Sequence, residues 1–133
     1  MAKYDPQAVM DARRKMLRER TPILQGQLAA DPANCDLMME LTMCMARSGD
    51  YRGRNGTAEL LRLLEMVLAK QPGNVDAIYL TAAVHLENEQ YVAARDFLLA
   101  RAPADARRER AIIICGYPYS PSLTPAIEWF RHI

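Results

Sequence analysis

The sequence has few of the residues that build metal centres or disulfide frameworks: its 133 residues include 3 Cys and 2 His. Cys35, Cys44 and Cys115 are odd in number and form no C-x-x-C pair. We therefore expect no disulfide framework, and small buried hydrophobic side chains in a reduced compartment. No Cys/His cluster has the spacing of a zinc site. The sequence thus predicts no metal and no cofactor.

Long hydrophobic runs and an excess of either charge are also absent. The most apolar short run, Ala111–Cys115, is far shorter than the roughly 20 residues that cross a bilayer. The first residues, Met1–Pro6, lack the hydrophobic core of a signal peptide. The 17 basic and 16 acidic residues leave a net charge of +1, which disfavours nucleic-acid binding by bulk charge. We expect a cytoplasmic protein with no membrane span and no nucleic-acid partner.

Apolar residues with helical spacing are abundant, and half of the chain is hydrophobic. Together with capping signals they predict an all-α fold, because no segment alternates with the period of a strand. The length suits one domain over residues 1–133. The expected helices cover residues 6–30, 34–48, 57–70, 75–88, 91–102, 105–115 and a short last segment from 124 to 133.

Three breaks in this pattern are informative. Thr21-Pro22 repeats the start signal of Asp5-Pro6, so either a second helix begins there or the first one kinks. The Gly-rich segment 51–56 predicts a loop, and a surface insertion is favoured there over an anion-binding loop. Segment 116–121 has two prolines and is expected to be irregular.

Two helix pairs have matching ends: Gly49-Asp50-Tyr51 in the first corresponds to Glu89-Gln90-Tyr91 in the second, 40 residues later. The pairs resemble the tetratricopeptide repeat (TPR), whose unit has about 34 residues, with the excess held in segment 52–57. In the first pair the signature positions fall on Met38, Leu41, Thr42, Met45, Gly49, Tyr51, Leu60, Leu64, Val67 and Pro72. In the second they fall on Ile78, Thr81, Ala82, His85, Tyr91, Ala94, Leu98 and Arg101. Leu60, Thr81, His85 and Arg101 depart from the usual residues.

The resemblance implies a TPR-like stack of antiparallel helix hairpins with capping helices. Repeats would cover residues 35–74 and 75–103, N-terminal helices residues 1–32, and a C-terminal capping region residues 104–133. It also implies that the chain binds another protein or a peptide along the concave face lined by the leading helices. Helical phase places these candidate partner-binding residues there: Glu40, Met43, Arg47, Tyr79, His85 and Asn88.

Two side-chain groups support either binding or plain structure. The methionines Met38, Met39, Met43 and Met45 would suit an adaptable binding surface or a Met-rich core. The arginines of segments 13–20 and 101–110 would suit acidic partner segments or a solvated face.

No catalytic constellation is present, so we predict that the chain is not an enzyme. His85 is expected in a core or groove position and His132 in solvent. Neither a phosphate-binding G-x-x-x-x-G-K-[ST] loop nor a G-x-S-x-G elbow occurs. The favoured interpretation is an adaptor or chaperone, for example of the secretion type. Alternatives are a TPR module of the organelle-fission or cytochrome-assembly type, a homodimeric structural protein, or a helical small-ligand enzyme using the loop 115–119.

Overall fold

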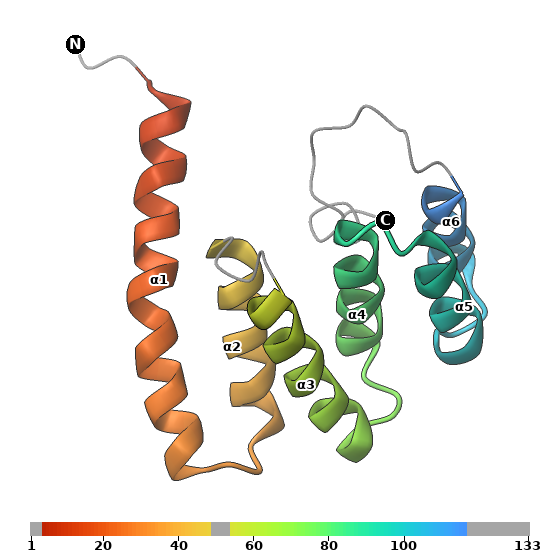
Figure 1. Cartoon of the computed structure of the whole chain (residues 1–133), viewed down its shortest axis with the longest axis horizontal. Coiled ribbons are helices and arrows are strands. Elements are labelled where there is room, and N and C mark those ends of the chain that lie inside the picture. Colours follow the sequence, from red (N-terminus) through yellow and green to blue (C-terminus); the bar gives the residue numbers. More distant parts are fainter. Residues whose placement is uncertain (1–3, 49–53, 117–133) are drawn as a thin grey trace. The chain divides into compact units, whose positions relative to one another are not determined.

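The computed structural model describes residues 4–48 and 54–116, and within them every regular element is an α-helix (Figure 1). The prediction of an all-α fold is therefore confirmed for this part of the chain. The helices are α1 (Pro6–Ala30), α2 (Cys35–Ser48), α3 (Arg54–Lys70), α4 (Val75–Glu87), α5 (Tyr91–Arg101) and α6 (Ala106–Cys115). The expected cap at Gly49-Asp50, the irregular segment after Gly116 and the last helix from 124 to 133 lie outside the described residues.

The start of α1 follows the capping signal in the sequence. The Asp5 carboxylate accepts hydrogen bonds from the backbone amides of Gln7 (3.0 Å) and Ala8 (3.3 Å), and Pro6 occupies the first turn. The helix continues through Pro22, so no second helix begins at Thr21. The Thr21 hydroxyl donates to the carbonyl of Leu17 (3.0 Å).

The predicted start of α3 is wrong by one turn. The helix begins at Arg54, so residues 54–56 belong to it and not to a loop. The first amides of a helix have no intrahelical partner, and Asn and Gly are well tolerated next to them. A Gly and an Asn therefore do not distinguish a loop from the first turn of a helix.

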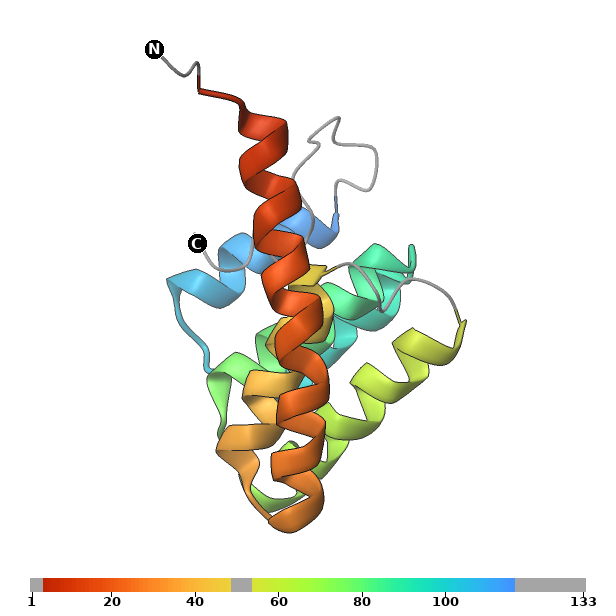
Figure 2. The same ribbon diagram turned by 90° about the vertical axis from the view of Figure 1, so that its left-hand side faces the viewer.

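The contacts of the chain form two compact units, residues 1–63 and 64–133, with the boundary inside α3. In the first unit α1 packs along α2 and extends beyond its end (Figures 1 and 2). In the second unit α5 packs against both α4 and α6. The division into repeats at residues 35, 75 and 104 stays a prediction.

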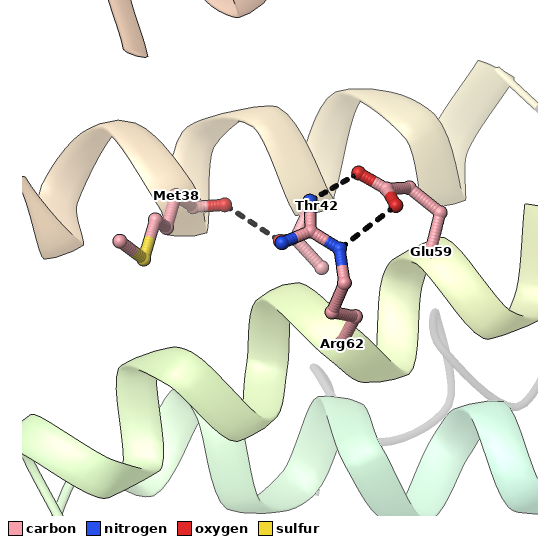
Figure 3. Close-up of polar contacts among 4 residues, drawn as sticks. All are labelled: Met38, Thr42, Glu59 and Arg62. Atoms are coloured by element: carbon pink, nitrogen blue, oxygen red, sulfur yellow. Dashed lines mark hydrogen bonds and ion pairs between the residues drawn. The ribbon is translucent and has the colours of Figure 1, made fainter. Parts of the chain in front are cut away.

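Buried side chains of α2 include Met38, Leu41 and Thr42. The Thr42 hydroxyl donates to the Met38 carbonyl at 2.6 Å, so this buried polar group is satisfied within its own helix (Figure 3).

On α3, the Arg62 guanidinium donates to both carboxylate oxygens of Glu59, at 2.7 and 3.0 Å (Figure 3). This hydrogen-bonded pair lowers the pKa of Glu59.

The core of the second unit is centred on α4, where residues 77–84 are all buried. Ala82 on α4 and Ala94 on α5 are completely buried, and the two helices pack against each other. The three cysteines are free and buried, as predicted. Burial raises the pKa of the Cys115 thiol to about 11.

Three turns between helices share one design. Each has Pro, a small residue, and then Asn or Asp, whose side chain accepts a hydrogen bond from the amide three residues later. The accepting and donating residues are Asn34 and Leu37 (3.1 Å), Asn74 and Ala77 (3.1 Å), and Asp105 and Arg108 (2.9 Å). Each turn thus satisfies one unpaired amide at the start of α2, α4 or α6.

Candidate partner-binding surfaces

The six candidate residues lie on two helices, Glu40, Met43 and Arg47 on α2 in the first unit, and Tyr79, His85 and Asn88 on or just after α4 in the second. Within each unit the structure gives these side chains different surroundings.

On α2, Glu40 is already engaged by α1. Its carboxylate accepts hydrogen bonds from Arg20 through Nε at 3.0 Å and through Nη2. This ion pair raises the pKa of Arg20. Both side chains are about half exposed, so a surface ion pair of this kind contributes little to stability. Glu40 is therefore already part of an ion pair that joins α1 to α2.

Met43 and Arg47 are half-buried and four residues apart, so they share one face of α2. Met39 and Met45 are also half-buried, whereas Met38 has no exposed surface. One of these four methionines therefore fills the core, and the other three are partly exposed. Burial raises the pKa of the neighbouring Cys44 thiol, and the positive charges of Arg20 and Arg47 offset part of this rise.

On α4, Tyr79 is only 2% exposed. The guanidinium of Arg107 lies 3.9 Å from the centre of its ring, a cation–π contact between α4 and α6. Burial and, to a lesser extent, Asp105 raise the pKa of the Tyr79 hydroxyl, against the opposing charges of nearby arginines. A partner would therefore meet Arg107 before it met the tyrosine ring.

His85 and Asn88 close the end of α4. The Nδ1 atom of His85 lies 2.8 Å from Oε1 of Gln90, and its imidazole is tilted against the ring of Phe97 at 6.3 Å. The side-chain amide of Asn88 donates to the carbonyl of Val84 (2.8 Å), which also accepts from the backbone amide of Asn88 (3.2 Å). Both side chains thus have structural contacts, and Asn88 stays exposed.

Sequence reasoning named the arginines of segment 101–110 but did not predict that two of them contact aromatic rings. Arg107 covers Tyr79, and Arg101 lies over the ring of Phe97 at 5.6 Å. The spacing of Phe97 and Arg101, four residues on one helix, was a signal that could have been used. The contact of Arg107 with Tyr79 joins residues 28 positions apart, and no local pattern marks it.

The described residues bear on two kinds of chemical site, a metal centre and a nucleophilic cysteine. Among residues 4–48 and 54–116, no group of three or more His, Cys, Asp and Glu side chains could hold a metal ion. Cys115, the first residue of the loop proposed for an enzyme, has a raised pKa, which makes its thiol a poor nucleophile. Tyr117, Pro118 and Tyr119 lie outside the described residues. In the same part of the chain, no helix has the length and apolar character to cross a membrane.

Comparisons with known proteins add no family. No family model matches the chain, and no curated protein or solved structure is detectably similar to it.

Proposed function

We propose that this chain is a protein-interaction adaptor or chaperone, built as a TPR-like helical array that holds a segment of a partner polypeptide. The observation that carries the proposal is the repeated turn of Pro, a small residue and a capping Asn or Asp before α2, α4 and α6. Repeated supersecondary units are characteristic of stacked helical arrays.

The spacing of the turns fits such an array. The caps Asn34 and Asn74 are 40 residues apart, and Asn74 and Asp105 are 31 apart, on either side of the roughly 34 residues of a TPR unit. In this arrangement α1, α3 and α5 are trailing helices, and α2, α4 and α6 are leading helices. The segment before Pro32 is then the trailing helix of an earlier unit.

The residues that we propose to bind the partner lie on the surface of α2. Met39, Met43 and Arg47 are partly exposed and follow one another at spacings of four, so they share one face of α2. Flexible thioether side chains adapt to different apolar partners, and a guanidinium adds a partner for a carboxylate or a carbonyl. This combination suits a chain held in an extended or helical form. The secretion-chaperone setting is preferred, with the fission-adaptor and cytochrome-assembly settings as alternatives.

The test is capture of a partner by the full chain, followed by binding of the identified partner as a purified protein. The double variant Met43→Glu, Arg47→Glu is expected to lose binding at least tenfold while keeping its helicity. Its matched control is Met66→Glu, Lys70→Glu on α3, a Met and a basic residue with the same spacing of four. The control should bind normally. Equal loss in both variants, or no loss in either, would contradict the proposed surface.

A further inference from the structure

The first half of α1 has no buried side chain over eleven consecutive residues, which is true of no other described helix. Residues 6–16 are all exposed, and Leu24 is the one buried side chain of the helix. With 25 residues against 14, α1 is about 16 Å longer than α2 at 1.5 Å per residue. Figure 2 shows this free length rising beyond α2.

A single seam runs along α1 with spacings of four and three, the pattern by which one helix packs along another. Its six positions are Met10, Arg14, Leu17, Thr21, Leu24 and Leu28. The last four are buried or half-buried, in the part of the helix that α2 accompanies, and the first two are exposed. The surface that accepts α2 therefore continues, uncovered, for about three turns.

The uncovered turns are both apolar and basic. Met10, in the seam, is 49% exposed, and outside the seam Val9 is 52% and Met16 70% exposed. Residues 6–16 carry three basic side chains, Arg13, Arg14 and Lys15, and one acidic side chain, Asp11, which accepts a hydrogen bond from Gln7 (2.9 Å). Arg14 lies within the seam, and Arg13 lies beside it. An occupant must therefore supply apolar side chains with carboxylates among them.

We propose that these turns of α1 are a docking site for an acidic amphipathic helix of another protein, which lies along the seam as α2 does further down. Its apolar side chains would pack on Met10, and its carboxylates would pair with Arg13 and Arg14, fork to fork. The site differs from the surface of α2 in the proposed function, and neither depends on the other.

Charge decides between this occupant and two others. A second copy of α1 would place one basic seam against another, which costs binding energy. A helix that lies on a lipid bilayer turns its apolar face inward and its basic side chains outward, whereas Arg14 lies within the same seam as Met10. A helix that carries carboxylates meets neither penalty.

The experiment uses the full chain and two synthetic 21-residue helical probes. Both carry Leu at the a and d positions; one carries Glu at e and g, and the other carries Lys there. The Glu probe should bind, and Arg14→Glu should weaken it at least tenfold. Lys15→Glu, the same charge change on the opposite side of α1, should leave binding within about twofold. Arg14→Glu should also gain binding to the Lys probe.

The other outcomes overturn the proposal. No binding of the Glu probe at about 0.1 mM, or equal loss in Arg14→Glu and Lys15→Glu, removes the seam as a specific site. Dimers in sedimentation that Met10→Glu abolishes would assign the seam to a second copy. Binding to phosphatidylserine vesicles without binding to the Glu probe would assign it to a membrane. The double variant Met43→Glu, Arg47→Glu should bind the Glu probe as tightly as the unchanged chain does. This result separates the test of the α1 seam from the test of the α2 surface.

Discussion

Helices α1 and α4 begin in the same way and are covered in opposite ways. Asp5 caps α1 and Asn74 caps α4, each through a side-chain oxygen that accepts from backbone amides. Yet α1 buries one side chain in 25 residues, whereas α4 buries residues 77–84 without interruption. A cap thus marks where a helix starts and carries no information on what covers it. The free energy that holds α4 comes from burial, and much of α1 depends on local interactions alone.

The largest expected difference between the two helices comes from one substitution made in both. Ile78→Ala removes a side chain that is 1% exposed, and we expect the free energy of unfolding to fall by about 3 kcal/mol. Ile23→Ala removes one that is 55% exposed, and we expect a change within about 0.5 kcal/mol. Urea denaturation of both variants measures the contrast. Similar losses would mean that α1 is covered in solution.

Thiol reactivity sharpens the same contrast. The Cys115 thiol has a pKa of about 11 because it is buried, whereas a cysteine placed on α1 by Met16→Cys should keep the ordinary value of about 8.5. At pH 8.5 the thiolate is then about 100-fold scarcer at Cys115, and alkylation should be slower by at least that factor. Mass spectrometry of iodoacetamide-treated protein measures each site.

The pH dependence of this experiment has a definite sign. Because folding raises the pKa of Cys115, its alkylation should keep accelerating up to about pH 11, while that of the cysteine at position 16 levels off above about pH 8.5. Over the same interval the fold should lose stability, because the unfolded chain releases this proton more readily. Equal rates at the two cysteines would show that the end of α6 opens readily.

The smallest expected effect compares the two caps. Asn74→Ala should lower the free energy of unfolding by about 1 kcal/mol, because the helix that it caps is part of the core. Asp5→Ala should change it by only a few tenths of a kcal/mol, since the first turns of α1 open without the rest. Hydrogen exchange should instead show faster exchange at the amides of Gln7 and Ala8. A full 1 kcal/mol loss in Asp5→Ala would place those turns in the cooperative unit.

Much of the helical layout could be read from local signals. Proline, asparagine and glycine at the ends of apolar stretches located five helices to within one or two residues, because capping depends on neighbours in the chain. The failure at residues 54–56 has the same origin, since Gly and Asn serve both a loop and a first turn. The exposure of Val9 and Met16 could not be read at all, because a stripe of apolar residues does not say whether another helix lies on it.

The candidate surface was harder to predict than the helices. Helical phase placed Met43 and Arg47 on one accessible face, but it also selected Tyr79, which is buried beneath Arg107. Phase gives a direction around one helix axis, whereas burial depends on neighbours far along the chain. The same limit explains why the contact of Glu40 with Arg20, across 20 residues, was not foreseen.

The buried threonines have a consequence for how the sequence can change over time. Thr42 and Thr81 each return their hydroxyl to a carbonyl of their own helix, at 2.6 and 2.7 Å. Neither hydroxyl needs a hydrogen-bond partner from an adjacent helix. A substitution of one aliphatic side chain for another on that helix therefore leaves no buried hydroxyl without a partner. Mutational drift on either side of these threonines is constrained by shape and volume, and far less by hydrogen-bonding chemistry.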